Sequence, residues 1–435
     1  MPTIEMHGQG FEECQSLIEE IKFRVADLDF RDQIVVQSVP GSVMELDGTS
    51  RPFIRIYTRQ ELRASALRDR LLDLVDIEVV YIEFFERMFP VGSGPNFESR
   101  LVSALEPINR AFTAFALYAF FDSGVAAALS NDSRTAAELS SICALAGDRL
   151  DALIVYLENE DFLKRDAEGR IGFTSKGQDI VHFEPWYRLL IGGYGVTLTQ
   201  LSQLLANGEQ YGARNVRDVA QGSCGISQYD AIPLLEGLLS EAAVRPSSFV
   251  DIGCGDGTFL LSVMSSLGVR SGVGLDADPN AIAAARRNAS NVGAGGDVQF
   301  LATDAASYIR ALDSSTKASG TCYVASFVLQ EMLQQSGEEA VVDVLRAIAA
   351  HSPGAHVLVI EVEPRGVGEH MKNGLARAYY NPYFLIHRLT EQRLETKEFW
   401  QGLFDRAGLE VIGIKTTDSS VDSTGFEFGA LLTPR

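Results

Sequence analysis

The sequence contains few cysteines and no long apolar run. Five of its 435 residues are cysteines, the number is odd, and no pair has Cys-x-x-Cys spacing. This excludes a disulfide framework and a thiolate zinc site, and it is typical of reduced thiols in a cytoplasmic protein. No segment reaches the ~18 consecutive apolar residues of a membrane span. The N-terminus has neither the basic nor the apolar segment of a secretory signal, so we expect no membrane partner.

Positive charge is also scarce. Lys and Arg total 37 against 58 Asp and Glu, which gives a net charge of −21. Such an excess of acid repels a phosphate backbone, and no local basic patch offsets it, so we expect no nucleic-acid partner. Hydrophobic residues make up 46% and charged residues 22%, which is ordinary globular composition. The length predicts about three domains at roughly 150 residues each.

Residues 1–96 and 97–228 form two regions of different character. The first mixes strand and helix patterns and is predicted to be a small α+β extension that adds dimer surface. Its strands are expected at 34–36, 53–57 and 77–82, and its helices at 11–25 and 61–74. The second region is helical, with a helix from a cap at Ser133 to Cys143, a helix at 147–157 and a hairpin turning at Glu168-Gly169. That order is a winged-helix pattern.

A winged helix commonly binds DNA, but the charge of its second helix opposes this function. Five acids and one arginine lie on or directly after that helix: Asp148, Asp151, Glu158, Glu160 and Asp161, with Arg149. They present the wrong sign to phosphates. The pattern therefore favours a dimerisation or lid module, and a DNA-binding regulator remains the alternative from another functional class.

Residues 229–435 alternate short strands with helices. The strands are expected at 249–252, 271–276, 298–301, 321–328 and 356–362. This alternation predicts an α/β, Rossmann-like, doubly wound domain with helices on both faces of a parallel sheet.

A glycine-rich turn follows the first of these strands. Asp251 ends the strand, and Gly253 and Gly255 begin a G-x-G-x-G turn that runs into the next helix. Glycine permits positive φ and close approach of a ligand. Asp276 ends the second strand, where a carboxylate can accept both hydroxyls of a ribose, and Asp304 follows the third.

These elements, in this order, resemble the class I S-adenosylmethionine-dependent methyltransferases. The resemblance implies that Asp251, Gly253 and Gly255 lie along the methionine portion of the cofactor, and that Asp276 holds its ribose. It places Asp304 and Ala305 at the adenine, with Phe327 in the same site. A nicotinamide dinucleotide is the alternative ligand. The preceding helical module is similar to that of small-molecule O- and C-methyltransferases, which implies a homodimer with the module above the substrate pocket.

The residues after the fourth strand bear on which atom is methylated. Many O-methyltransferases place a histidine base there, whereas this chain has Gln330, and an amide is not a base. Residues 387–408 resemble methyltransferases that alkylate the β-carbon (C3) of 2-oxo acids, including phenylpyruvate-type and 2-ketoarginine enzymes. We therefore expect a C-methyltransferase of a small-molecule 2-oxo acid, with 5-guanidino-2-oxopentanoate (2-ketoarginine) as the first candidate. O-methylation of a natural-product hydroxyl is the alternative.

The same resemblance implies a divalent or ferric metal ion held by Gln330 and His387. A metal would stabilise the enolate of the 2-oxo acid. Glu331 and His387 are the candidate catalytic residues, and the base is either Glu331 or a metal-bound water. His387 is otherwise an ordinary packed histidine. Tyr194 and Arg214, with Gln330, are candidate substrate ligands, Arg214 for the carboxylate, unless it is a surface arginine.

Overall fold

The computed structural model describes residues 3–7, 23, 35–39, 44–46, 49–51, 53–57, 78–83 and 97–435, the last range without 131, 207, 209, 295–296 and 313–319. The chain divides into two compact units, Met1–Phe112 and Thr113–Arg435, and each is described by itself. The boundaries expected at 96/97 and 228/229 stay predictions.

The first unit contains a four-stranded sheet in the order β2-β1-β5-β6. Its strands are β1 (Thr3–His7), β2 (Val35–Val39), β5 (Phe53–Tyr57) and β6 (Glu78–Glu83), and a small hairpin joins β3 (Met44–Leu46) to β4 (Thr49–Arg51). The three expected strands are present, and β1 was not predicted. The helices expected at 11–25 and 61–74 lie outside the described residues, apart from Phe23, which is helical.

The second unit begins with the helix–helix–hairpin order that the sequence predicted. The elements are the end of α3 (Phe97–Asp122), then α4 (Val125–Leu129), α5 (Ala136–Cys143), α6 (Gly147–Asn159), β7 (Leu163–Arg165), β8 (Ile171–Phe173) and α7 (Ser175–Val181). Thr135, not Ser133, caps α5: its hydroxyl accepts from the Glu138 amide, and the Glu138 carboxylate accepts from the Thr135 amide. Thr135 is the cap because a capping box needs a glutamate three residues later, and Glu138 holds that position relative to Thr135 but not to Ser133.

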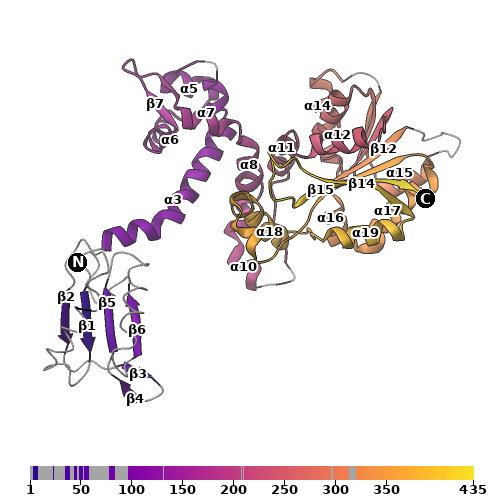
Figure 1. The fold of residues 1–435 in the computed structure, drawn as a ribbon. Coiled ribbons are helices and arrows are strands. Elements are labelled where there is room, and N and C mark those ends of the chain that lie inside the picture. Colours follow the sequence, from indigo (N-terminus) through magenta and orange to yellow (C-terminus); the bar gives the residue numbers. More distant parts are fainter. Residues whose placement is uncertain are drawn as a thin grey trace. The chain divides into compact units, whose positions relative to one another are not determined.

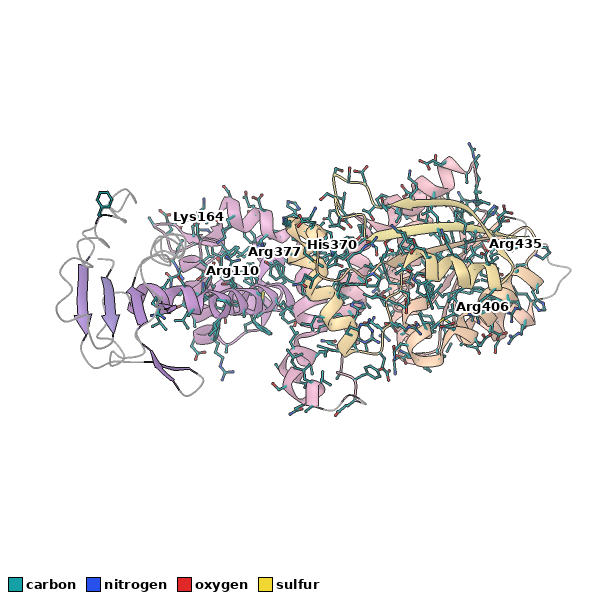
Figure 2. All side chains as sticks on the ribbon, turned by 60° about the horizontal axis from the view of Figure 1, so that its bottom comes forward. Arg110, Lys164, His370, Arg377, Arg406 and Arg435 are labelled. Carbon is teal, nitrogen blue, oxygen red and sulfur yellow. The ribbon has the colours of Figure 1, made fainter. Side chains whose placement is uncertain are left out.

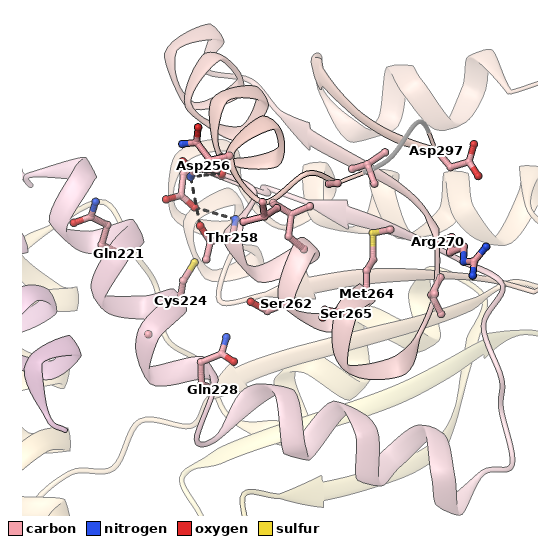
Figure 3. A pocket seen from close by; sticks show the side chains of 18 residues that line it. Gln221, Cys224, Gln228, Asp256, Thr258, Ser262, Met264, Ser265, Arg270 and Asp297 are labelled. Atoms are coloured by element: carbon pink, nitrogen blue, oxygen red, sulfur yellow. Dashed lines mark hydrogen bonds between the residues drawn. The ribbon is translucent and has the colours of Figure 1, made fainter.

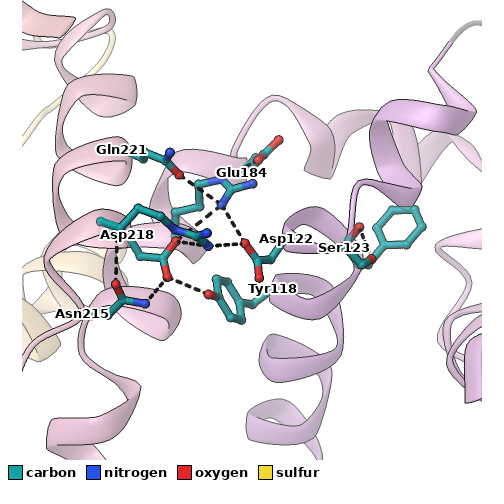
Figure 4. A network of polar contacts seen from close by, with 10 residues as sticks. Tyr118, Asp122, Ser123, Glu184, Asn215, Asp218 and Gln221 are labelled. Carbon is teal, nitrogen blue, oxygen red and sulfur yellow. Dashed lines mark hydrogen bonds and ion pairs between the residues drawn. The ribbon is translucent and has the colours of Figure 1, made fainter. Parts of the chain in front are cut away.

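A helical segment leads from this module towards the sheet. It comprises α8 (Glu184–Tyr187), the π-helix η1 (Arg188–Gly193), α9 (Gly195–Thr199), α10 (Leu201–Ala206) and α11 (Val216–Ser227). A polar network joins α3 to α11 (Figure 4). Tyr118 donates to Asp218 over 2.7 Å, and Arg188 lies between Asp218 and Asp122. Because Asp218 is fully buried, this network fixes α11 against the helical module.

The sheet of the second unit has seven strands in the order β11-β10-β9-β12-β13-β15-β14 (Figure 1). They are β9 (Ser248–Ile252), β10 (Ser271–Asp276), β11 (Val298–Ala302), β12 (Thr321–Ser326), β13 (His356–Val362), β14 (Leu409–Thr416) and β15 (Glu427–Pro434). The first five are parallel, and β15 is antiparallel to both its neighbours. The predicted doubly wound α/β domain is confirmed.

Helices cover both faces of this sheet. One apolar core packs α12 (Ala231–Glu241), α13 (Thr258–Leu267) and α14 (Pro279–Asn291) on one face. A second core packs α15 (Ala305–Ala311), α16 (Leu329–Ser336), α17 (Glu338–His351) and α19 (Lys397–Arg406) on the other (Figure 1). Strands buried on both sides read as continuous apolar runs, as β13 does.

Ion pairs and short helices complete this unit. Arg406 at the end of α19 pairs with Glu338 on α17 over 3.0 Å, and Arg435 pairs with Asp405. Figure 2 labels the two arginines. The segment after β13 forms η2 (Glu369–Lys372), the π-helix η3 (Ala376–Tyr380) and α18 (Asn381–Leu389). Of the helices in the part of the chain described, none is long and apolar enough to span a bilayer.

Candidate active site

The glycine turn after β9 adopts the backbone that its sequence requires. Gly253 and Gly255 have φ of +71° and +53°, in the left-handed region that favours glycine. A Cβ on Gly253 would lie 2.4 Å from Cγ2 of Val328, so only glycine fits there. A Cβ on Gly255 would meet no atom within 4 Å. The backbone at Gly255 is therefore open to a ligand.

Two acids flank this turn. Asp251 is buried at the end of β9, and its Oδ2 has no hydrogen-bond partner. Burial, reinforced by the nearby charge of Asp276, raises the pKa of Asp251 to about 8. The Oδ2 of Asp276 accepts from the amide of Gly255 over 3.0 Å, and its Oδ1 accepts from the amide of Asp278. This pairing ties the tip of β10 to the glycine turn.

The other predicted cofactor residues lie at the same edge of the sheet. Asp304 follows β11 by two residues and caps α15, because its Oδ1 accepts from the Ser307 amide over 2.8 Å. Its hydrogen bonds from Ser307 lower its pKa. Ala305 is buried beside it. Phe327, just after β12, has a φ of +54°, a strained backbone that often marks a functional site.

The structure thus brings the seven predicted cofactor residues to the carboxyl ends of four neighbouring strands, β11, β10, β9 and β12. Ligands bind at this edge in open α/β sheets, at the point where the strand order reverses. The orphaned carboxylate oxygen of Asp251 and the open backbone at Gly255 fit a ligand with a cationic group.

A small cavity of about 70 Å³, lined by both polar and apolar side chains, adjoins this edge. It is lined by five residues that the sequence predicted: Tyr194, Phe327, Gln330, Glu331 and His387. The two π-helices border it, since Leu189 of η1 and Tyr379 of η3 are among its lining residues. π-Helical turns occur frequently at functional sites. The cavity holds only a few waters as it stands, so a larger ligand requires one of these borders to move.

A chain of hydrogen bonds runs along one side of the cavity. Arg214 donates to Oε1 of Glu331 over 2.5 Å, and the Gln392 amide donates to the same oxygen over 3.0 Å. The hydroxyl of Tyr194 in turn donates to Oε1 of Gln392 over 3.1 Å. Arg214 is therefore not a surface arginine. Its guanidinium forms an ion pair with Glu331, which lines the cavity.

His387 is buried and neutral. Its Nδ1 lies 2.7 Å from the carbonyl oxygen of Tyr383, and because a carbonyl only accepts, Nδ1 carries the proton and Nε2 is a free acceptor. Its ring stacks on that of Tyr383 with centroids 3.7 Å apart. Burial, with a smaller contribution from the charge of Arg214, lowers the pKa of His387 to about 3 against the opposing bond to Tyr383.

Gln330 is the buried amide at the start of α16. Its Nε2 donates to the carbonyl oxygen of Phe327 over 3.2 Å, whereas its Oε1 has no partner. Its backbone amide donates to the buried carboxyl of Glu361 over 3.3 Å. Gln330 and His387 thus bring two neutral acceptor atoms to one cavity. Within the described residues, no group of three or more His, Cys, Asp or Glu is arranged to hold a metal ion.

The sequence interpretation missed two acids, two tyrosines and one amide of this cavity. Asp230, Glu427, Tyr379, Tyr383 and Gln392 line it but were not predicted as site residues. One signal for Glu427 was available, since it is an acid that opens an otherwise apolar strand. No sequence signal marked Asp230 as a site residue, because an acid directly before a helix is expected to be its N-cap. Asp230 does cap α12.

A second hollow, of about 1150 Å³, lies between α11, α13 and α14 (Figure 3). Gln221 and Cys224 on α11, with Gln228 directly after it, face Thr258 and Ser262 on α13 across it. Although larger, it contains none of the strand-end acids, and its lining lies mainly along the outer surfaces of helices. We therefore take the cavity beside Gln330 as the candidate active site.

Comparisons with known proteins agree with this geometry. Residues 249–350 match a family described as a methyltransferase domain. The 2-ketoarginine methyltransferase of Streptomyces arginensis is 39% identical over 343 residues, which cover 78% of this chain and 97% of that protein. Among solved structures, the match to the mitomycin 7-O-methyltransferase MmcR covers 78% of this chain and 98% of that chain, with a TM-score of 0.55 and 14% sequence identity.

The pyocyanin biosynthetic protein PhzM likewise covers 78% of this chain and all of its own, with a TM-score of 0.52 and 16% identity. At such identities the two structures show a shared fold only. The sequence relative and the matched domain confirm the expected family and the expected enzyme class. This chain belongs to the class I S-adenosylmethionine-dependent methyltransferases, in one family with the 2-ketoarginine methyltransferase of S. arginensis.

Proposed function

We propose that S-adenosylmethionine lies across the glycine turn, with its methyl group directed at the cavity beside Gln330. The ammonium of its methionine portion contacts Asp251, whose buried Oδ2 lacks a partner. Asp276 binds the ribose hydroxyls, and Asp304 and Ala305 border the adenine. Phe327 stands between the cofactor and the cavity, which it lines. An open backbone at Gly255 supports this placement.

The acceptor in this proposal is a 2-oxo acid methylated on C3, with 5-guanidino-2-oxopentanoate as the preferred substrate. The observation that carries it is the ion pair between Arg214 and Glu331 at the cavity. It supplies a guanidinium for the carboxylate of the acid and a carboxylate for its C3 proton. The name of the relative from S. arginensis supports the same substrate.

Arg214 orients the substrate by binding its carboxylate, which competes with Glu331 for the guanidinium. The released Glu331 takes a proton from C3, and the electrons of that C–H bond form the enolate. C3 then attacks the methyl carbon, and the methyl–sulfur bond breaks towards sulfur, leaving S-adenosylhomocysteine and a 3-methyl-2-oxo acid. The cavity walls hold the two carbons in line, which supplies much of the rate.

Gln330 and His387 are the residues that would hold a metal ion. The unpartnered Oε1 of Gln330 and the free Nε2 of His387 fit such an ion as neutral donors. The ion, when bound, polarises the ketone of the 2-oxo acid. The same two residues orient the substrate by their position in the cavity wall.

The test is to incubate the protein with S-adenosylmethionine and a panel of 2-oxo acids and phenols, with and without a chelator. We expect mass spectrometry to show methylated 2-oxo acids. We also expect lower activity after the protein has been treated with chelator and exchanged into metal-free buffer. Transfer to the hydroxyl of a phenol, with none to any 2-oxo acid, would favour an O-methyltransferase instead. Activity that does not change on chelation would refute a role for a metal ion, whereas the proposal that a carbon atom is methylated would stand.

We also propose that the protein is a homodimer. In the first unit, α3 exposes four large apolar side chains at alternating spacings of four and three residues: Leu101, Leu105, Ile108 and Phe112. This is the spacing of a helix–helix seam. Sedimentation of the protein beside a Leu105→Glu, Ile108→Glu variant tests it. We expect a dimer and a monomer, respectively, and a monomeric parent protein would refute the proposal.

A further inference from the structure

Two buried carboxyls face the cavity from different parts of the chain. Asp230 lies between α11 and α12, and Glu427 begins β15, and both line the cavity. They are exposed by only 7% and 3%. Burial, together with the nearness of the other carboxyl, raises the pKa of Glu427 well above its usual range. Burial likewise raises the pKa of Asp230 to about 7.

Neither carboxyl has a cation to neutralise it. Within the described part of the chain, Asp230 and Glu427 form no ion pair, in contrast to Glu363, another buried acid at this edge, which pairs with Arg365 and Lys397. The partners of the two are neutral groups and each other: Asp230 accepts from the Ala231 amide, Glu427 accepts from the Thr417 hydroxyl over 2.9 Å, and the two carboxyls are hydrogen-bonded to one another. Buried acids without such a partner are costly for folding, so their retention here calls for a ligand.

Two further observations in the same cavity point to a cationic, hydrogen-bond-donating ligand. The Oε1 of Gln330, with the side chain 1% exposed, has no hydrogen-bond partner. The rings of Tyr379 and Tyr383, 5.7 Å apart between centroids, also line the cavity. Aromatic rings attract a guanidinium held near their faces. The cavity therefore offers a carboxyl pair, an unpartnered amide oxygen and aromatic rings to such a ligand.

We propose that Asp230 and Glu427, flanked by Tyr379, form the subsite that binds the guanidinium of the acceptor and thereby select it over neutral 2-oxo acids. This inference rests on the proposed function. Glu331, the partner of Arg214, lines the same cavity, so a linear substrate has a cation for its carboxylate and anions for its far end. A planar guanidinium donates to two carboxylates at once, which an alkyl chain does not.

The selection follows from the free-energy cost of leaving the two buried carboxyls without a cationic partner. A neutral chain in the cavity leaves the two carboxyls with only each other and their neutral partners, whereas a guanidinium donates to both and brings a positive charge. Such a site rejects the analogue that lacks the donor group more strongly than a purely apolar pocket would.

The experiment compares kcat/KM for 5-guanidino-2-oxopentanoate and for 2-oxohexanoate in four proteins. These are the parent protein, Asp230→Asn, Glu427→Gln, and the matched control Glu363→Gln, which removes a buried acid outside the cavity. Each variant keeps the shape of the side chain. Calorimetric binding of S-adenosylhomocysteine reports whether each protein is folded.

We expect Asp230→Asn and Glu427→Gln to lower kcat/KM for the guanidino acid by about 30-fold or more, as loss of a desolvated charged contact does. The values for 2-oxohexanoate should not fall and should rise if anything, because a neutral chain then meets one buried acid fewer, and Glu363→Gln should not change the ratio of the two substrates. Equal losses for both substrates would overturn the inference.

Two other outcomes separate the inference from the function on which it rests. A parent protein that methylates 2-oxohexanoate and rejects the guanidino acid would overturn the subsite while 2-oxo-acid methylation stands. If no 2-oxo acid is methylated, the proposed function fails. Calorimetric binding of the guanidino acid to protein loaded with S-adenosylhomocysteine then decides the subsite: weaker binding in both cavity variants supports it, and unchanged binding overturns it.

Discussion

Arg214 and Glu331 are 117 residues apart in the chain, yet Nη1 of the arginine lies 2.5 Å from Oε1 of the glutamate. Gln392 donates to the same oxygen, so Glu331 is held from two directions. This arrangement brings the segment before α11 to the start of α16, beside the strained backbone of Phe327. A substrate carboxylate that displaces Glu331 from Arg214 both binds and releases the proposed base.

Replacing Arg214 should therefore act on acceptor binding. We expect Arg214→Gln to raise KM for a 2-oxo acid by about 30-fold, because a desolvated ion pair with the carboxylate is lost. The dissociation constant for S-adenosylmethionine should change little. Arg217→Gln is the control, since Arg217 is 59% exposed and pairs with Asp122 instead. Steady-state kinetics with a fixed cofactor concentration checks this, and an unchanged KM would contradict the assigned role.

Asp276→Asn should weaken cofactor binding. The carboxylate already accepts from the Gly255 amide, and the proposal adds the ribose hydroxyls. Loss of its charge should raise the dissociation constant for S-adenosylmethionine by about 10-fold or more, as expected for hydrogen bonds to a charged group. Isothermal calorimetry measures it. Asp278→Asn, which alters only the cap of α14, should leave the dissociation constant nearly unchanged.

The buried carboxyl of Asp251 should make stability depend on pH. Its pKa of about 8 in the folded chain exceeds the usual 3.8, so the folded state binds more protons than the unfolded state between these values. Its contribution to stability is present at low pH and is lost as the pH rises through 8. Asp251→Asn should remove this slope and stabilise the ligand-free protein at pH 8 by about 3 kcal/mol.

Urea unfolding between pH 5 and pH 8.5 measures that difference. Asp304→Asn gives the opposite sign, because the hydrogen bonds from Ser307 lower the pKa of Asp304 and its contribution is present at higher pH. An Asp251→Asn protein with the same slope as the parent would contradict the role of burial at Asp251.

The network beneath α11 should be needed for stability. Asp218 is fully buried, accepts from Tyr118 over 2.7 Å and lies 3.5 Å from Nη1 of Arg188. Asp218→Asn leaves Arg188 partly uncompensated and should lower the free energy of unfolding by about 3 kcal/mol. Asp122→Asn, at a carboxylate that is 38% exposed, should cost under about 1 kcal/mol. Equal effects in denaturant unfolding would refute this ranking.

The sheet and the cofactor turn were predictable because their signals are local. Each strand is a short apolar run, and Gly253 and Gly255 lie beside the acid that ends β9, so adjacent letters suffice. The strand-end acids Asp276 and Asp304 follow from the parallel topology, which brings carboxyl ends to one edge. Arg214 was predicted as a carboxylate ligand from its place before the sheet, and no local pattern indicated its contact with Glu331.

The acceptor cavity was only partly predictable, because its walls come from distant segments. Asp230, Tyr379 and Glu427 converge from the start of α12, a π-helix and the last strand, and no short pattern links them. Tyr379 also packs within the core, because its ring lies against those of Tyr380 and Tyr383. Tertiary packing, not local sequence, decides which of these side chains faces a ligand.

The most direct test follows the transferred methyl. The protein is incubated with S-adenosylmethionine carrying ¹³C in its methyl group and with 5-guanidino-2-oxopentanoate, and the product is examined by ¹³C NMR. Our account predicts a labelled methyl coupled to the carbon at C3 of the 2-oxo acid. A labelled methyl on oxygen or nitrogen, or label that never leaves the cofactor with any 2-oxo acid, would contradict it.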